Sequence, residues 1–259
     1  MRTHLLGLPV DILSRADTIA IATQAMREGR PCQHVALNVA KLVSARRDPE
    51  LDRDIRSSDI VGIDGIGIAW ALGLLGRKIP ERVAGIDLFE GLIAISATQR
   101  FRPYLLGATR EVLEAAMRTL QERHPTLEFA GCHHGYFGPD EEDRLCEEIA
   151  KSGADGLYVA MPTPRKERFM LRNRHRLGVP FVMGIGGTLD VISGQVRRAP
   201  RLMQRLGLEW LYRMSQEPRR LSGRYLRTNA TFAGLLLREL GTRAFEHSGV
   251  DRPADERRP

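Results

Sequence analysis

The sequence has few cysteines and no long apolar segment. Its 259 residues include three cysteines, Cys32, Cys132 and Cys146, which form neither a C-x-x-C pair nor a metal-ligand spacing. This odd, scattered set argues against a disulfide framework and a zinc site, and fits a reducing compartment. No stretch approaches the roughly 20 apolar residues of a membrane span, and the apolar run near residue 5 is too short for a signal peptide. We therefore expect a cytoplasmic protein with one core, or one core and an appendage.

The positive charge of the chain is concentrated at its carboxyl end. Residues 197–259 contain fourteen arginines and seven acidic residues, which accounts for the whole formal charge of +7 and leaves residues 1–196 neutral. This asymmetry predicts a neutral catalytic body with a basic attachment that meets phosphate, an anionic membrane or nucleic acid. Because large apolar residues are interleaved with these arginines, an interfacial helix is favoured over a solvated tail.

Strand-like and helix-like segments alternate through the body. Buried strands are predicted at 34–39, 59–63, 102–107, 127–131, 156–161 and 179–185, and helices at 109–123, 140–152 and 164–175. This alternation predicts an α/β fold, with a mainly parallel sheet and helices on both faces.

After residue 196 the strand signals end. Two helices are predicted, at 201–214 and 217–240, and a tail from 247 to 259 is expected to be disordered. The chain is thus divided into a catalytic body (1–196), a basic amphipathic helical appendage (197–246) and the tail. On the second helix Arg220, Arg224 and Arg227 share one face.

The most suggestive local signal is an aspartate at the end of a predicted strand. Asp64 is followed by Gly65, Gly67 and an apolar helix. In open α/β sheets ligands bind beyond the carboxyl ends of the strands, so Asp64 lies where a general base or a ligand anchor is expected. Capping of the following helix is an equally good explanation of the spacing.

Glycine junctions at 184–190 and 106–110 could bring backbone amides close to a phosphate, with a plain turn as the alternative. The Walker pattern and G-x-G-x-x-G are missing, which argues against nucleotide hydrolysis and dinucleotide redox chemistry. Asp52 and Asp54 form a D-x-D within a pattern typical of a solvated helix. Adjacent His133 and His134 are expected to point to opposite faces of an extended segment. The sequence therefore predicts no metal site and no cofactor.

A series of short motifs occurs in order between residues 38 and 229. They are Asp64-Gly65-Ile66-Gly67, Pro80–Leu88, Gly135-Tyr136-Phe137, Pro164–Glu167, Gly186–Asp190, Arg198-Ala199-Pro200, Gly207–Arg213 and Gln216–Arg220. Together, with their spacing, they strongly resemble the WecG/TagA/CpsF family of bacterial glycosyltransferases.

The resemblance implies an inverting, metal-independent transfer from a UDP-sugar to a polyprenyl-diphosphate-linked saccharide, in the synthesis of teichoic acid, common antigen or exopolysaccharide. It implies a Rossmann-like body and a C-terminal appendage that binds the inner face of the plasma membrane. By the same resemblance Asp64 is the general base. The implied substrate-binding residues are Asn38, Arg82, Asp87, Tyr136, Lys166, Glu167, Gly186, Gly187 and Asp190. Those implied to face the lipid and its diphosphate are Arg213, Arg220, Arg224 and Arg227.

Two positions depart from the family pattern. Ala36 stands where a threonine is usual, and Lys166 stands where a glutamine is usual. A cation in the donor pocket could favour a sugar carboxylate or stabilise the departing diphosphate. The candidate donors are UDP-glucose, UDP-glucuronate and UDP-N-acetylmannosamine or its uronate, and the departures favour glucose or a uronic acid.

Two other functions are weighed against this one. A nucleic-acid-binding protein would explain the arginine-rich end but not the body, so no nucleic acid is expected as a partner. A catalytically retired member acting as an assembly factor would explain the two departures, whereas intact Asp64, Arg82 and Asp190 favour an enzyme. A homo-oligomer stays open as well, since apolar residues near Trp210 and Leu235 need to be covered.

Overall fold

A parallel six-stranded sheet forms the centre of the fold. The computed structural model describes residues 1–216 and 218–248, of which residues 219–221, 224 and 243–248 are described by their backbone alone. The strands are β3 (Cys32–Leu37), β4 (Ile60–Ile63), β5 (Pro103–Gly107), β6 (Gly131–His133), β7 (Gly156–Ala160) and β8 (Phe181–Gly184). They lie in the order β4-β3-β8-β7-β5-β6, and every pairing is parallel. The predicted Rossmann-like α/β class is confirmed.

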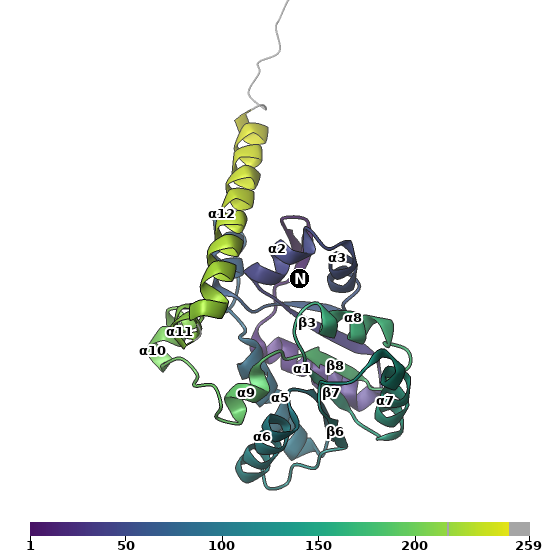
Figure 1. The fold of residues 1–259 in the computed structure, drawn as a ribbon. Helices are drawn as coiled ribbons and strands as arrows, with labels where there is room; N and C mark the ends of the chain where they lie inside the picture. The colour runs from purple at the N-terminus through teal and green to yellow at the C-terminus, as the bar shows by residue number, and fades with distance from the viewer. Residues whose placement is uncertain (217, 249–259) are drawn as a thin grey trace, which may run out of the picture.

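Helices cover both faces of this sheet (Figure 1). On one face lie α1 (Arg15–Glu28), α5 (Gly85–Gln99), α6 (Arg110–Arg123) and α9 (Thr188–Ile192). On the other lie α2 (Val39–Ala45), α3 (Pro49–Arg56), α4 (Ile66–Leu74), α7 (Pro139–Lys151) and α8 (Arg165–Arg172). Because both faces are covered, β5 and β7 are buried at every position, which explains their continuous apolar sequence.

The strand predicted at 127–131 lies further along the chain, so this prediction was wrong. Pairing of β6 with β5 begins only at Gly131. The residues before it form a turn, in which the Leu127 amide donates to the His124 carbonyl. A Cβ on Gly131 would lie 2.6 Å from the ring of Tyr104. This glycine is therefore needed where the pairing begins.

An N-terminal hairpin that was not predicted lies against the β4 edge of the sheet. Its strands β1 (Arg2–Leu5) and β2 (Leu8–Asp11) are antiparallel. In the turn between them Leu6 has φ +49°, a conformation that usually selects glycine or asparagine. Asp11 accepts a 2.8 Å hydrogen bond from the Val61 amide of β4. The hairpin thereby protects an edge strand, whose amides would otherwise be open to pairing.

The appendage begins with two short helices instead of the single helix predicted at 201–214, so this prediction was wrong. They are α10 (Arg201–Arg205) and α11 (Glu209–Gln216). Gly207 lies between them with φ +71°, and a residue in the left-handed conformation ends an α-helix. Its Cβ would also lie 2.5 Å from Ile66 of α4. The chain therefore bends where it passes close to the body.

The last helix, α12 (Pro218–Ser248), is longer than the predicted 217–240. Within residues 1–216 and 218–248, no helix combines the length and the apolar character needed to span a membrane. The predicted disordered tail lies, from residue 249 onward, outside the described residues.

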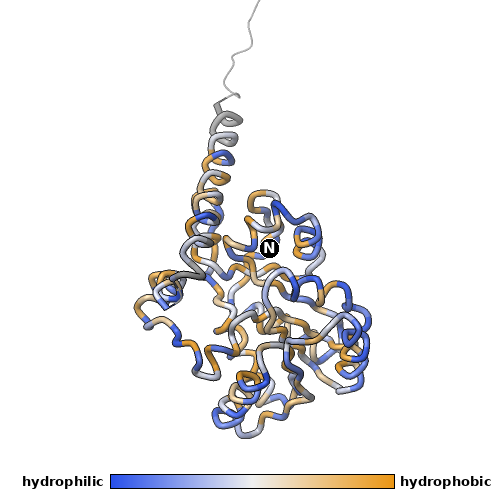
Figure 2. The backbone as a smooth tube through the Cα atoms, viewed as in Figure 1, coloured by the Kyte–Doolittle hydropathy of each residue, from blue (hydrophilic) through white to orange (hydrophobic). Residues whose placement is uncertain are grey.

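Part of α12 packs on the body and the rest projects from it (Figure 1). Phe232 is 7% exposed and belongs to the core beneath α2, with Leu235 and Leu236 partly buried beside it. Trp210 of α11 packs on Tyr225 of α12, with ring centroids 5.8 Å apart. Figure 2 shows apolar positions along α12 both where it meets the body and where it projects. The appendage is thus anchored on the body and still presents apolar surface.

Candidate active site at the carboxyl edge of the sheet

The carboxyl edge of the sheet gathers most of the residues predicted to bind substrate. Each lies in the loop that follows a strand or near the beginning of the next helix. Across the sheet they are Asp64 after β4, Asn38 after β3, Gly186, Gly187 and Asp190 after β8, Lys166 and Glu167 after β7, and Tyr136 after β6. Parallel strands present their carboxyl ends at one edge, where ligands of open α/β sheets bind. This edge is the candidate active site.

Asp64 is anchored through one carboxylate oxygen. Its backbone amide donates to the Leu37 carbonyl at 3.1 Å, which continues the pairing of β4 with β3. Its Oδ1 accepts a 3.0 Å hydrogen bond from the amide of Gly85, the first residue of α5. The side chain therefore fixes the start of α5 and does not cap the adjacent α4, which has no side-chain cap. The second oxygen, Oδ2, forms no hydrogen bond within the described residues, so it is available to a ligand.

Two glycines let the loops after β3 and β4 approach each other. A Cβ on Gly65 would lie 3.2 Å from Asn38 Cβ, and a Cβ on Gly67 would lie 2.6 Å from Val39 Cγ2. Asn38 is the N-cap of α2, and its Oδ1 accepts the Lys41 amide at 3.0 Å. This capping bond fixes the side chain of Asn38 in the loop that packs against Gly65.

A buried cluster of two lysines and one glutamate links α2 and α8 next to this edge. Lys41, Lys166 and Glu167 are 5%, 6% and 1% exposed. Glu167 Oε1 lies 2.8 Å from both ammonium groups. Lys41 also donates to the Ala36 carbonyl at 2.6 Å, and Lys166 donates to the Thr163 hydroxyl at 2.5 Å. Both ammonium groups thus have the partners that buried charges require, and the cluster keeps a net positive charge.

The cluster shifts the pKa of its own members. Burial, followed by repulsion from Lys41, lowers the pKa of Lys166 to about 8, against the opposing effects of Glu167 and Asp64. Burial would raise the pKa of Glu167, but the two lysines outweigh it and lower that pKa to about 2. A Cβ on Gly184 would lie 3.0 Å from Lys166 Cε, so the lysine stem passes over the end of β8. Lys166 therefore brings a pH-sensitive cation into the electrostatic range of Asp64.

Glycines also shape the loop after β8. Gly186 has φ +53°, and no atom lies within 4 Å of the position that its Cβ would take. A Cβ on Gly187 would lie 3.3 Å from Asp190 Oδ2. The open space at Gly186 is compatible with the predicted approach of a phosphate to this backbone.

An ion-pair network beside the site joins the body to the appendage. Arg82 Nη1 lies 2.7 Å from Glu209 Oε2 of α11, and Arg82 Nη2 donates to the Gln204 carbonyl at 3.3 Å. Arg198 Nη2 lies 2.7 Å from Asp87 Oδ1, and Arg198 Nε lies 3.6 Å from Glu209 Oε1. Arg82 and Asp87, both predicted to bind substrate, are thus in contact with the C-terminal segment.

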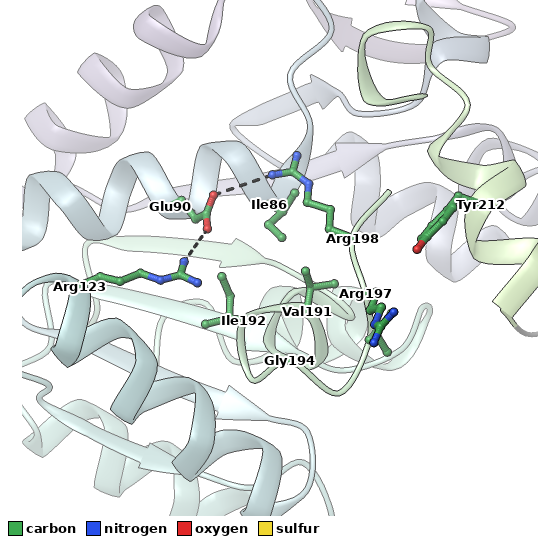
Figure 3. Close-up of a pocket in the computed structure, with 10 residues that line it drawn as sticks. Ile86, Glu90, Arg123, Val191, Ile192, Gly194, Arg197, Arg198 and Tyr212 are labelled. Carbon is green, nitrogen blue, oxygen red and sulfur yellow. Dashed lines mark hydrogen bonds and ion pairs between the residues drawn. The ribbon is translucent and has the colours of Figure 1, made fainter. Parts of the chain in front are cut away.

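Two cavities adjoin this network. Asp87 lines a polar cavity of about 770 Å³, together with the four arginines Arg15, Arg82, Arg201 and Arg205. Arg198 lines a second cavity of about 430 Å³, shown in Figure 3. In this second cavity the apolar side chains are those of Ile86, Val191, Ile192 and Val196. Both volumes are typical of ligand sites. Asp64 lines neither cavity. Val83 and Ala84, which line the larger one, come directly before Gly85, the hydrogen-bond partner of Asp64.

The chain matches the Glycosyl transferase WecG/TagA/CpsF family over residues 3–245. It belongs to this family. The protein is therefore a glycosyltransferase, which requires a sugar donor and an acceptor. The match extends beyond the motifs between residues 38 and 229, and it includes the N-terminal hairpin and most of α12. The resemblance drawn from the motifs is confirmed.

Tyr136 of this glycosyltransferase stands on a braced loop. Its side chain is 71% exposed. Arg165 holds the loop by donating to the Gly135 and Phe137 carbonyls at 2.9 and 2.8 Å. The guanidinium of Arg165 also lies 4.5 Å from the centre of the Phe137 ring. The position of Tyr136 at the edge is compatible with packing against a ligand.

The four arginines predicted to face the lipid are described in part. Arg213 of α11 and Arg227 of α12 are exposed. The backbones of Arg220 and Arg224 belong to α12, but their side chains lie outside the described residues. A role for these arginines at a lipid diphosphate stays a prediction.

Two interpretations of candidate metal ligands were wrong in detail. Asp54 lies in α3 as expected, but it is 6% exposed instead of solvated, and burial raises its pKa to about 6. The rings of His133 and His134 are only 4.5 Å apart, because the chain leaves the extended conformation after β6. Within the described part of the chain, no three His, Cys, Asp or Glu side chains are grouped to hold a metal ion.

Three charged residues of this region were not among the predicted site residues. Arg198 and Glu209 fall inside family motifs, which was a usable signal. Lys41 pairs with Glu167, far along the chain, and no local pattern indicates such a contact. The only hint in the sequence was that Lys41 follows closely after a predicted buried strand.

Proposed function

We propose that this glycosyltransferase moves a sugar from a UDP-sugar onto a polyprenyl-diphosphate-linked saccharide, with inversion and with Asp64 as the general base. The observation that carries the proposal is the carboxylate of Asp64, held by the Gly85 amide through one oxygen only. Lys166 lies within its electrostatic range, and the amide of Val83, the residue after Arg82, donates to the carbonyl of Ile63, the residue before Asp64.

This arrangement suits a single displacement at the anomeric carbon. The acceptor oxygen would form its bond to that carbon while the bond to UDP breaks. The hydroxyl proton would pass to Asp64, and UDP would leave with the electron pair. Attack opposite the leaving group inverts the configuration. The open oxygen of Asp64 supports the first role, and Arg82 and Lys166 supply positive charge for the departing diphosphate without need of a metal.

The buried cation Lys166 supports the proposal that the donor differs from N-acetylmannosamine. Its ammonium lies beside the hydroxyl of Thr163 and is within the electrostatic range of Asp64. A sugar carboxylate or a diphosphate bound at the edge would be attracted by this positive charge. Glucose or a uronic acid is the proposed donor sugar. Unchanged donor preference of Lys166→Gln in a panel of UDP-sugars would contradict this assignment.

The appendage supports a peripheral place at the inner face of the plasma membrane. Several large apolar side chains of α4 and the appendage are exposed, namely Trp70, Leu74, Leu202, Leu206, Leu211, Leu226 and Leu237. Apolar side chains among arginines are typical of interfacial helices that bind anionic lipid. Such a surface would bring the carboxyl edge close to a lipid-linked acceptor used in cell-surface polysaccharide synthesis.

Calorimetric titration with UDP tests the donor class. Saturable binding of UDP, together with weak and salt-sensitive binding of duplex DNA, is the expected result. Tight DNA binding without UDP binding would favour the nucleic-acid function. UDP binding without turnover for any UDP-sugar would favour the retired enzyme.

A further inference from the structure

One carboxylate at the junction of body and appendage lies between two guanidinium groups. Arg82 Nη1 is 2.7 Å from Glu209 Oε2, and Arg198 Nε is 3.6 Å from Glu209 Oε1. The side chains of Arg82, Arg198 and Glu209 are 18%, 23% and 19% exposed. Glu209 is therefore held by two cations in a place that solvent still reaches.

The second arginine of this pair lies near three carboxylates, those of Asp87, Glu90 and Glu209, and still has donors without a well-formed hydrogen bond among the described residues. Arg198 Nη2 lies 2.7 Å from Asp87, yet Nη2 and Nε are buried atoms without a well-formed hydrogen bond in the described part of the protein. Buried donors of this kind gain from a ligand with several acceptor oxygens. Guanidinium groups are the usual partners of phosphate groups.

The position of the pair fits a ligand of the adjacent site. Arg82 precedes Val83, whose amide donates to the Ile63 carbonyl next to Asp64. The cavity that Arg82 lines also holds Arg15, Arg201 and Arg205, against two acidic residues, and Arg198 lines the neighbouring cavity. A ligand with about two negative charges would balance this lining.

We propose that Arg82 and Arg198 form a diphosphate-binding pair, and that Glu209 occupies it as an internal competitor until a diphosphate displaces it. Displacement frees α11 from the body and so links ligand binding to the docking of the appendage. The identity of the natural diphosphate, on the donor or on the lipid acceptor, rests on the function proposed above. The competition itself rests on the contacts of Glu209 alone.

If Glu209 competes with the ligand, removing its charge should strengthen diphosphate binding. Glu209→Gln keeps the shape of the side chain and removes its negative charge. Arg82 and Arg198 then no longer bind a competing carboxylate, so the affinity for inorganic pyrophosphate should rise by about tenfold. A glutamate that merely orients Arg82 would have the opposite effect, since its loss would leave the arginine less well placed.

Calorimetry with inorganic pyrophosphate tests this on the full chain. The matched control is Glu147→Gln, which removes an equivalent charge from an exposed pair with Lys151 in α7. We expect tighter binding for Glu209→Gln and wild-type binding for the control. Equal or weaker binding by Glu209→Gln would overturn the proposal. Arg198→Ala should weaken binding, and an unchanged affinity there would overturn the role of Arg198.

Amide hydrogen exchange supplies a readout that a purely structural glutamate would not move. Exchange across residues 209–216 should increase when pyrophosphate binds the wild-type protein, and no change on binding would contradict displacement. Titrations with UDP and with a short-chain prenyl diphosphate identify the source of the ligand, because the same gain in Glu209→Gln is expected for the natural one. If pyrophosphate binding tightens while UDP does not bind, the displacement holds and the proposed UDP-dependent function fails.

Discussion

A glutamate lies between two cations at two places in this molecule. In the body, Glu167 is 1% exposed and lies 2.8 Å from each of two lysine ammonium groups. At the junction with the appendage, Glu209 is 19% exposed and lies between Arg82 and Arg198. The first glutamate is buried, whereas the second is partly exposed to solvent. The body thus contains a buried charge cluster, and the junction contains a partly exposed one, from which we propose that a ligand displaces Glu209.

The energetics follow the same division. Removing one member of a buried charge cluster leaves uncompensated charge and costs about 3–5 kcal/mol. A fully exposed ion pair contributes only about 0–1 kcal/mol, and the partly buried pairs of Glu209 should lie between these two cases. Loss of a charge from the body cluster should therefore reduce stability more than loss of Glu209.

The largest effect is expected where the body performs chemistry. Asp64→Asn keeps the hydrogen bond with Gly85 within reach and removes the base, so the transfer rate should fall by about 10²- to 10⁴-fold. UDP binding and vesicle binding should persist, since neither depends on proton removal. Steady-state kinetics and calorimetry measure the two parts. A near wild-type rate would remove Asp64 from the proposed role.

A matched pair of substitutions tests the two glutamates directly. Glu167→Ala should lower the free energy of unfolding by about 3–5 kcal/mol, because two lysines lose their shared partner. Glu209→Ala should lower it less, by about 1–2 kcal/mol, because its ion pairs are only partly buried. Urea unfolding measures both. Similar losses for the two variants would erase the proposed difference between body and junction.

The pH dependence of stability provides a further test of the buried cluster. The pKa of Glu167 is lowered from 4.5 to about 2 in the folded protein, so its contribution to stability is present above pH 4.5. That contribution, about 3 kcal/mol, should be lost as the pH falls from about 4.5 towards 2. Glu167→Gln should lose this part of the acid dependence, whereas Glu147→Gln should keep it. Identical acid unfolding curves for all three proteins would argue against the shift.

A smaller effect is expected on the appendage. Leu202→Glu with Leu206→Glu places negative charge on its exposed apolar surface and should weaken binding to anionic vesicles several-fold. Transfer to a water-soluble acceptor should stay unchanged, since α10 does not contain the base. Co-sedimentation with vesicles measures binding, and Ile21→Glu on α1 is the control for an exposed apolar residue elsewhere. Equal losses in both variants would contradict a localised membrane surface.

Much of the body could be predicted because its signals are local. Buried parallel strands are continuous apolar runs, and Asp64 follows one of them directly, so its place at the carboxyl edge followed from the order of segments. The N-terminal hairpin could not, because its turn uses Leu6 where a turn residue is expected. The break at Gly207 depends on contact with Ile66, far along the chain.

The ion-pair clusters escaped prediction for the same physical reason. Lys41 meets Glu167, and Arg82 meets Glu209, only after the sheet and the appendage have assembled. Neither pair leaves a periodic pattern in the sequence. Arg82 was predicted as a site residue, but its carboxylate partner was visible only in three dimensions.

The most direct measurement of the central claim is UDP release from a panel of UDP-sugars, with and without a short-chain prenyl-diphosphate-linked saccharide. We expect release that depends on this acceptor, is fastest for a glucose or uronic acid donor, and is lost in Asp64→Asn. Absence of release from every donor, or release that ignores the acceptor and survives in Asp64→Asn, would contradict it.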